Sequence, residues 1–211
     1  EYFLNKVIKE SKLLDKLFGG APFTFPKSIY AVYDCVKAVT KNDKNAIIMD
    51  FFSGSATTAH AVMMLNSEDG GTRKHIMVQL PEDLDEALQR SSDAKTKAQI
   101  KTAIAFLDSI EKPHTICEIG KERIRRAGDK IKAEAGLTAQ NLDIGFRVLK
   151  LDDTNMKDVY YAAGDYTQDM IALMESNIKP DRTDLDLLYG CLLYWGLPLS
   201  MPHTHEKIDG F

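Results

Sequence analysis

The stretch DFFSGSATTAHAVMMLN at residues 50–66 decides the fold, because three different patterns meet in it. It begins within the apolar run AIIMDFF at 46–52, and such a run is typical of a strand buried on both faces of a parallel sheet. The small residues SGSA at 53–56 follow, and an alanine- and methionine-rich segment comes next. The stretch therefore predicts a strand, a bare loop and a helix over about 57–65.

A second strand is expected after this helix. The polar turn NSEDGGTRK at 66–74 leads into HIMVQL at 75–80, which is again mostly apolar. A strand, a helix and a further strand in this order indicate a right-handed crossover between parallel strands. The predicted fold class is thus α/β with an open, mainly parallel sheet.

Helical periodicity and one alternating segment define the rest of the chain. Residues 81–115 are polar and helix-prone, and we interpret them as a mobile surface insertion with one helix between flexible ends. Alternating apolar residues predict a third strand over 143–151. The expected helices cover 3–18, 28–40, 115–135 (with Thr115 as N-cap and Gly136 just past the end), 167–177 and 184–195.

The composition narrows the class of protein. Of the 211 residues, 44% are hydrophobic and 27% are charged, which is typical of a soluble globular protein. The formal net charge of −4 argues against a protein that coats nucleic acid without sequence preference. No segment is long and apolar enough to span a membrane, and the isolated Cys35, Cys117 and Cys191 favour a reducing, cytoplasmic setting. The chain starts at Glu1 without a methionine, and we expect it to be a fragment.

The small residues at 53–56 form a candidate ligand site. In an open parallel sheet, ligands bind beyond the carboxyl ends of the strands, where small residues let the backbone approach them. The N-terminus of the following helix adds amide donors and partial positive charge. The loop lacks the Gly-Lys-Ser/Thr of a Walker phosphate loop and the three glycines of a dinucleotide fingerprint. Taken alone, it is equally compatible with a tight turn that binds nothing.

Five segments resemble one group of enzymes. The pattern D-x-F-x-G-S-x-T-T at 50–58 is similar to the S-adenosylmethionine loop of amino-DNA methyltransferases, although Ala56 stands where that family usually has a second glycine. The segment FTFPKSIYAVYDCV at 23–36 resembles the region that covers the methionine end of this cofactor. Three more segments resemble the modification subunit of type III restriction-modification systems: RKHIMVQLPE at 73–82, ICEIGKERIRRAG at 116–128 and DIGFRVLKLDDTNMKDVYY at 143–161.

This resemblance implies a site-specific DNA adenine-N6 methyltransferase with a Rossmann-like sheet and S-adenosylmethionine as its cofactor. Members of the family use an Asp/Asn-Pro-Pro-aromatic motif for the transfer, but no two prolines are adjacent in these 211 residues. We therefore expect the catalytic motif and the recognition region to precede the cofactor loop in the whole protein, and this chain alone to be inactive. The implied partners are DNA, a second copy of the subunit and a helicase-nuclease restriction subunit.

Residues around the loop are assigned roles by the same resemblance. Asp50 would receive the methionine ammonium, or else cap the following helix. Phe52 would lie against the cofactor, or else belong to the core. Backbone at Gly54 and its neighbours would approach the cofactor, while the hydroxyls of Thr57 and Thr58 would bind its carboxylate or cap the helix.

Two further positions complete the expected site. Lys27, with Ser28, would pair with the carboxylate, the alternative being a solvated lysine. The ribose needs an acceptor at the end of the second strand, and either Gln79 or Glu82 could serve, with Glu82 preferred for its charge. The expected cofactor-binding residues are Phe25, Lys27, Ser28, Asp50, Phe52, Ser53, Gly54, Ser55, Thr57, Thr58, Gln79 and Glu82.

The basic segment KERIRRAGDKIK at 121–132 has two interpretations. It could contact DNA phosphates, but Ile116, Ile124, Ala127 and Ile131 give the same helix an apolar face. Its charges are therefore better explained as the solvated side of that helix. The segment HTHE at 203–206 contains residue types that bind metals, but it has no partner cluster, and we assign no metal. His60, His75 and His114 stand alone, and we interpret them as structural or surface residues.

Two domains are expected. Residues 1–142 would form the cofactor-binding part, and 143–211 a helical C-terminal extension for assembly. Within the latter, LLYGCLLYWGLPL at 187–199 is more apolar than a surface helix requires and is a candidate interface. The rival to a methyltransferase is therefore an assembly module that keeps the fold and contributes mainly subunit contacts.

Overall fold

The chain forms two compact units, Glu1–Gly145 and Phe146–Phe211. The computed structural model describes residues 16–19, 23, 27–136, 142–158, 164, 167, 170 and 177–207. The expected helix over 3–18 lies mostly outside these residues, as does the one over 167–177. None of the helices that the structure describes is both long and apolar enough to cross a membrane.

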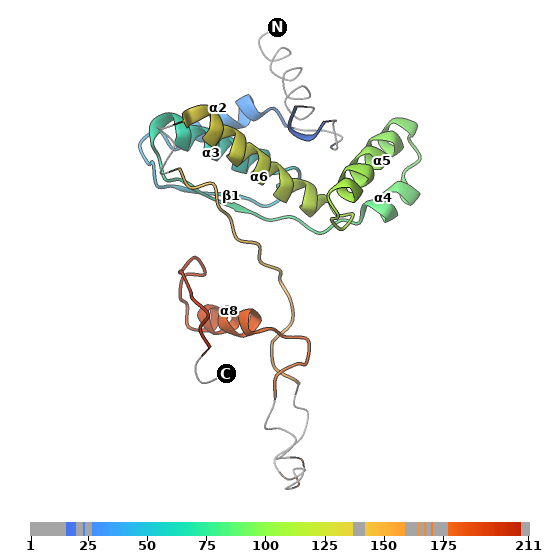
Figure 1. Ribbon diagram of the computed structural model, residues 1–211, viewed down its shortest axis with the longest axis vertical. Helices are drawn as coiled ribbons and strands as arrows, with labels where there is room; N and C mark the ends of the chain where they lie inside the picture. Colours follow the sequence, from blue (N-terminus) through green and yellow to red (C-terminus); the bar gives the residue numbers. More distant parts are fainter. Residues whose placement is uncertain are drawn as a thin grey trace. The chain divides into compact units, whose positions relative to one another are not determined.

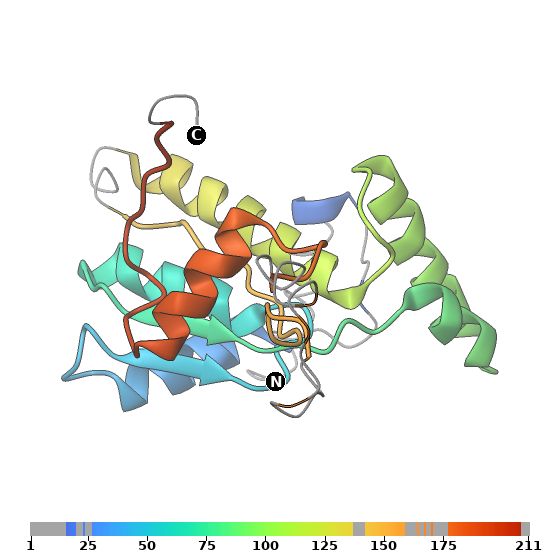
Figure 2. The same cartoon turned by 90° about the horizontal axis from the view of Figure 1, so that it is seen from below.

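The first unit contains a parallel strand pair joined by a helix, as predicted. Strand β1 covers Ile47–Asp50, strand β2 covers Lys74–Met77, and helix α3, Thr57–Asp69, lies between them in the chain. The strands pair in parallel, with Ile47 opposite Lys74 and Asp50 opposite Met77. Figure 2 shows the two arrows side by side, pointing the same way. This arrangement confirms the α/β class for the strand–helix–strand segment.

Helices α2, Ile29–Val39, and α6, Ile116–Ala135, lie together with α3 on one side of β1 (Figure 1). The bounds of α2 and α6 are close to the predicted ones. Val36, Val62 and Leu65 are buried between α2 and α3, and Ile48 of β1 packs against them. The apolar face of each helix is thus buried against the sheet or a neighbouring helix.

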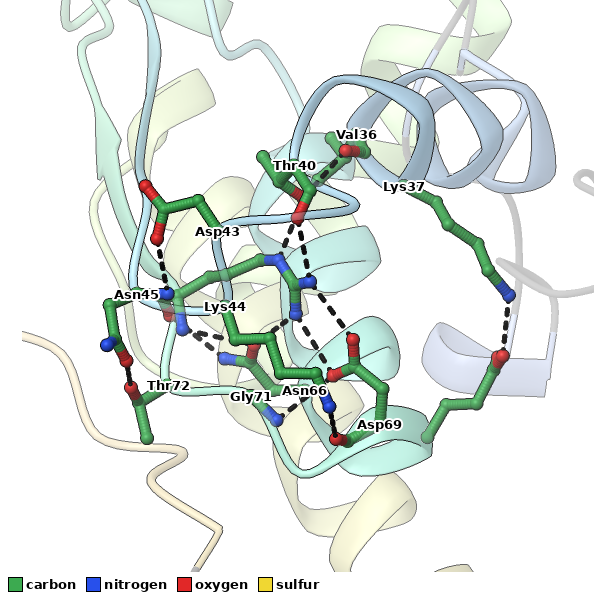
Figure 3. Close-up of polar contacts among 12 residues, drawn as sticks. Val36, Lys37, Thr40, Asp43, Lys44, Asn45, Asn66, Asp69, Gly71 and Thr72 are labelled. Atoms are coloured by element: carbon green, nitrogen blue, oxygen red, sulfur yellow. Dashed lines mark hydrogen bonds and ion pairs between the residues drawn. The ribbon is translucent and has the colours of Figure 1, made fainter.

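A buried arginine joins the ends of these elements. Arg73, just before β2, donates hydrogen bonds to the Thr40 hydroxyl and carbonyl at 2.8 and 3.2 Å and pairs with the Asp69 carboxylate at 3.0 Å. The Asn66 side chain completes the contact by bonding the Arg73 backbone. Figure 3 shows Thr40, Asn66 and Asp69 converging on this point. Because Thr40 ends α2 and Asp69 ends α3, the two helices run in the same direction.

The other face of the strand pair is open, so the prediction of a strand buried on both faces is wrong for this chain. Ile47 is 65% exposed, and Met49 and Ile76 are also exposed. Side chains alternate across a strand, and in the described part of the first unit only the Ile48 side is covered by helices. The strand predicted from the apolar run is therefore present, but it is less buried than the run predicts.

The predicted insertion contains two helices where one was expected. Helix α4 covers Leu84–Arg90, helix α5 covers Ala94–Ser109, and each begins at an aspartate that caps it. Leu84 and Leu107 are buried with Ile119 of α6 in one apolar cluster. Ile100 and Ile104 of α5 pack against the same cluster, so the helical pair lies against α6. The mobility of residues 81–115 stays a prediction.

His114 links both helices of this pair. Its Nδ1 lies 2.8 Å from the Asp85 carboxylate of α4, and its Nε2 lies 2.8 Å from the Asp108 carboxylate of α5. Hydrogen bonds to Asp108 and Asp85 raise the pKa of His114 above its usual value. Only the imidazolium can donate to both carboxylates at once.

We therefore expect the packing of α4 and α5 to weaken as the pH rises. A group whose pKa is raised by folding contributes its full stabilisation below the unfolded pKa, about 6.5 for histidine, and loses it as the pH passes the folded pKa. In the wild type, amide hydrogen exchange in residues 84–109 should accelerate as the pH rises through the folded pKa of His114. This acceleration should exceed the ordinary increase of the exchange rate with pH. His114→Gln should remove that extra acceleration, and an equal acceleration in both proteins would contradict the assignment.

In the second unit, helix α8 covers Asp184–Tyr194, as expected. The Thr183 hydroxyl accepts from the Asp186 N–H, and the Asp186 carboxylate accepts from the Thr183 N–H, which forms a capping box. The prediction of a third strand over 143–151 is wrong, because the structure assigns residues 142–150 to neither helix nor strand. Apolar alternation alone does not make a strand where no neighbouring strand pairs with it among the described residues.

Candidate functional site

Strands β1 and β2 and helices α3 and α6 meet at the loop between β1 and α3, residues 51–56, which we call the β1–α3 loop. It follows the carboxyl end of β1, and its Ser53 N–H donates to the Val78 carbonyl beyond β2 at 3.2 Å. Helices α2 and α3 run in the same direction, so their N-termini lie at the same end of the unit. The N-terminal half of α6 also packs here, since Gly120 lies against Gly54 and Ala56. This is the strand-end position at which open parallel sheets bind ligands.

Two left-handed residues shape the loop. Gly54 has a φ of +50° and Ala56 has a φ of +58°. A Cβ at Gly54 would lie 3.1 Å from the ring of Phe23, so this position is tight as well as left-handed. Ala56 holds a conformation that favours glycine, which explains why the resembling family usually has glycine there. The positive φ values and the short distance to Phe23 therefore both constrain the backbone of the loop.

Asp50 organises the loop from the end of β1. One carboxylate oxygen accepts from the Phe52 N–H at 3.2 Å, and the other accepts from the Thr58 hydroxyl at 2.6 Å. Asp50 does not cap α3, because the N-cap position is Ala56 and no side chain caps it. The capping alternatives for Asp50, Thr57 and Thr58 are thus wrong, and the first amides of α3 have no side-chain acceptor.

The two ribose candidates differ in their contacts. The Gln79 side-chain oxygen accepts from the Gly54 N–H at 2.8 Å, and its amide donates to the Leu80 carbonyl at 3.3 Å. Gln79 thus fastens the loop to the end of β2. Glu82 is exposed, and its backbone pairs with Leu80 and Ile116. The carboxylate of Glu82 is therefore more accessible to a ligand than the amide of Gln79.

The remaining expected residues lie in different environments. Phe25 falls outside the described residues, and Lys27 is exposed. The Ser28 hydroxyl is buried without a hydrogen-bond partner at the N-cap of α2, where it makes no cap hydrogen bond. Phe52 is 81% exposed, so the alternative that placed it in the core is wrong.

The hydroxyls of Ser55 and Thr57 point inward. Both residues are buried, and both hydroxyls accept from the Arg123 guanidinium of α6, at 3.0 and 2.9 Å. Any contact of Ser55 with a ligand must therefore use its backbone. Arg123 is fully buried, so the interpretation of this basic helix as a solvated side is wrong for that residue.

Sequence reasoning missed Phe23, Gly120 and Arg123, although a signal existed for two of them. Gly120 and Arg123 are spaced by three and four residues from the apolar positions of α6, so they lie on its buried face. The other arginines of the segment behave differently. Arg125 is exposed, and Arg126 lies over the rings of Phe18 and Phe106.

Near the loop, His60 of α3 is neutral at physiological pH. Burial, followed by the positive charges of Arg123 and Lys130, lowers the pKa of His60 to about 3. Burial also lowers the pKa of His75 in β2. Among the residues that the structure describes, no group of His, Cys, Asp and Glu side chains could hold a metal ion.

Chemically, this arrangement is suited to binding. It offers a bare backbone and the uncapped N-terminus of α3 for a negatively charged group. For positive or hydroxyl groups it offers the Asp50 carboxylate at the end of β1 and the exposed Glu82 carboxylate, which follows β2 in the chain. An ammonium, a carboxylate and a hydroxyl group are the chemical groups that these features could bind.

No family model matches the chain. It is 39% identical over 141 residues to the StyLTI Mod subunit of a type III restriction-modification enzyme from Salmonella typhimurium, covering 66% of this chain and 18% of that protein. It is 32% identical over 202 residues to the EcoPI Mod subunit from Escherichia phage P1, covering 94% of this chain and 27% of that protein. Over 66 residues, it is 44% identical to the type II methyltransferase M.KpnI from Klebsiella pneumoniae, covering 31% of this chain and 15% of that protein.

Proposed function

This chain is homologous to the Mod subunits of type III restriction-modification enzymes, and we propose that it supplies the S-adenosylmethionine-binding part of such a DNA methyltransferase. It spans 18% and 27% of the length of the two Mod subunits. The observation that carries the proposal is the β1–α3 loop, where a left-handed glycine and the uncapped start of α3 meet the carboxyl ends of both strands.

The residues of the loop fit the charged end of this cofactor. The N-terminus of α3 and the partnerless Ser28 hydroxyl would receive the carboxylate, with Lys27 adding positive charge. Asp50 would receive the ammonium, exchanging or sharing its bond to Thr58. The backbone of Ser53, Gly54 and Ser55 would approach the methionine chain, with Phe52 and Phe25 as apolar cover.

The ribose would bind at the end of β2. Two ribose hydroxyls are donors, and a carboxylate accepts two strong hydrogen bonds. Glu82 is exposed there, whereas the Gln79 oxygen already accepts from the Gly54 N–H. We therefore assign the ribose to Glu82 and give Gln79 the task of holding the loop. When bound, the cofactor supplies the methyl group, and these residues fix its position.

In the whole protein, the methyl group would go to the amino group of adenine in a specific DNA site. The names of the relatives, Mod subunits of restriction-modification enzymes, support a restriction subunit as a partner. We further propose that the whole protein pairs with a second copy of itself and acts in the cytoplasm. The rival is an assembly module that binds no cofactor, and the second unit favours part of it. Leu193, Tyr194 and Trp195 at the end of α8 are exposed in the described residues.

A calorimetric titration separates the two functions. We expect the chain to bind S-adenosylmethionine and to gain thermal stability from it. Glu82→Gln should weaken binding about tenfold, since hydrogen bonds to a charged acceptor contribute about 1.5–3 kcal/mol. Glu86→Gln is the matched control, because Glu86 is a nearby exposed carboxylate paired with Arg90.

Wild-type affinity in the control and a loss in Glu82→Gln would support the ribose assignment. Equal affinities in both variants would remove Glu82 from the site. If the wild-type chain gave neither heat nor a thermal shift with the cofactor while it self-associated, the assembly module would be the better description.

A further inference from the structure

Arg123 occupies an unusual place for a charged side chain. It is fully buried within α6, directly behind the β1–α3 loop. Its Nη1 donates to the Ser55 hydroxyl at 3.0 Å and to the Thr57 hydroxyl at 2.9 Å. Arginine is almost never fully buried without partners, because removing a charge from water is costly. The burial of Arg123 at this position therefore indicates a specific role at the loop.

Both acceptors flank the strained part of the loop. Ser55 precedes Ala56, which has a positive φ, and Thr57 is the first residue of α3. One guanidinium nitrogen therefore spans the turn from loop to helix. A left-handed conformation at a residue other than glycine persists only where its surroundings enforce it. The hydrogen bonds from Arg123 to the hydroxyls of Ser55 and Thr57 supply such a constraint.

Gly120 lies one helical turn earlier on the same face of α6. A Cβ there would lie 3.1 Å from the Gly54 carbonyl and 3.7 Å from the Ala56 side chain. The absent side chain lets α6 approach the loop backbone closely, which brings Arg123 within reach of both hydroxyls. Gly120 and Arg123 thus form one supporting surface beneath the loop.

The charge of Arg123 also lies near the start of α3. A positive charge at this point adds to the partial positive charge of the helix N-terminus. After burial itself, Arg123 is the largest cause of the lowered pKa of His60, on the same helix. Its field is therefore felt across the first turn of α3.

We propose that Arg123 is a positioning residue for cofactor binding, which holds the β1–α3 loop through Ser55 and Thr57 and strengthens the site for a carboxylate at the start of α3. This inference rests on the proposed function. It concerns a residue that lies behind the loop and acts on the ligand through the loop and through its charge. It differs from a purely structural role, which would lower stability and leave the affinity of the folded protein unchanged.

A second buried arginine in the same chain provides the control. Arg73 is buried to a similar degree and joins α2, α3 and β2 at the opposite end of α3 from the loop. Arg123→Lys and Arg73→Lys both retain the charge and lose the planar pair of donors. Both should lower the melting temperature. Only Arg123→Lys should weaken S-adenosylmethionine binding, by about tenfold, when titrated well below that temperature.

A double-mutant cycle tests the route through the hydroxyls. The cycle compares a double variant, Ser55→Ala with Thr57→Val, and the same variant with Arg123→Lys added. If Arg123 acts through the two hydroxyls, the added substitution should cause no further loss of affinity for S-adenosylmethionine. Should Arg123→Lys fail to fold, Ser55→Ala, Thr57→Val alone should show the tenfold loss.

The outcomes separate the two proposals. No binding by the wild-type chain would remove the proposed function. Wild-type binding together with unchanged affinity in folded Arg123→Lys, or an equal loss in Arg73→Lys, would overturn the inference about Arg123 and leave the proposed function in place.

Discussion

Gly54→Leu is expected to abolish binding of S-adenosylmethionine while the rest of the chain stays folded. Gly54 has a φ of +50°, a conformation that costs a residue with a side chain about 1–3 kcal/mol. The new Cβ would lie 3.1 Å from the Phe23 ring, and the remaining leucine atoms need further room. The loop can accept leucine only by changing its path, which would move the Gly54 N–H away from Gln79. The cofactor would then lose its backbone surface.

Gly70→Leu is the matched control for this experiment. Gly70 also has a positive φ, +67°, but it lies at the C-terminal end of α3 and a Cβ there meets nothing within 4 Å. Both variants carry the same conformational strain, and only one lies at the proposed site. Calorimetric titration should show a loss of about a hundredfold or more in Gly54→Leu and wild-type affinity in Gly70→Leu. Wild-type affinity in Gly54→Leu would exclude the loop from the site.

The local sequence pattern was sufficient for the strand pair and for helices α2, α3 and α6 of the first unit. An apolar run that stops at Asp50, followed by small residues and a helical segment, specifies a strand, loop and helix with little help from the rest of the chain. Capping and glycine positions located the ends of α6 to within a residue of Thr115 and Gly136. These features depend on neighbours in the sequence, so sequence reasoning could find them.

Features that depend on distant contacts were harder to predict. The strand predicted over 143–151 failed because pairing needs a partner strand, which apolar alternation does not reveal. The inward direction of the Thr57 hydroxyl depends on Arg123, 66 positions away in the chain. Arginine in a basic segment is usually solvated, so only its four-residue spacing from Ile119 and Ala127 could have indicated burial.

Burial of the sheet was overestimated for a related reason. An apolar strand indicates that both faces are covered in the assembled protein, but it does not say by which segment. Ile47, Met49 and Ile76 are exposed in the described part of this chain. A patch of this kind on a soluble protein marks a surface that meets another segment or partner. The homologous Mod subunits are several times longer than the region shared with this chain.

The largest expected effect concerns catalysis: we predict that the chain alone transfers no methyl group to DNA, even when saturated with S-adenosylmethionine. The amino nitrogen of adenine is a poor nucleophile, because its lone pair is delocalised into the ring. The base also lies inside the duplex. An enzyme must extrude and stack it, and must accept hydrogen bonds from the amino group as the methyl group arrives.

The residues around the β1–α3 loop bind and orient a donor, which is only half of this task. The resembling family performs the other half with an Asp/Asn-Pro-Pro-aromatic motif, and none of the seven prolines in this chain is adjacent to another. Asp50 cannot take over that role easily, because its carboxylate is held by Thr58 and Phe52 within the loop. Positioning of the donor without a group that receives the base leaves the barrier to transfer almost unchanged.

Transfer of radiolabelled methyl groups to duplex DNA measures this directly, with a complete type III Mod subunit as the positive control. The chain should give background counts at cofactor concentrations that saturate it in calorimetry.

A companion polypeptide that carries the motif and recognition region of a Mod subunit should restore transfer if it docks on the chain. The exposed face of β1 and β2 is a surface on which it could dock. Restoration that also requires an intact Gly54 would show that the donor is held by the β1–α3 loop during the reaction. Labelled adenine produced by the purified chain on its own would mean that these 211 residues contain a base-receiving group of another kind, and that donor binding and base binding are not divided between two parts of the protein.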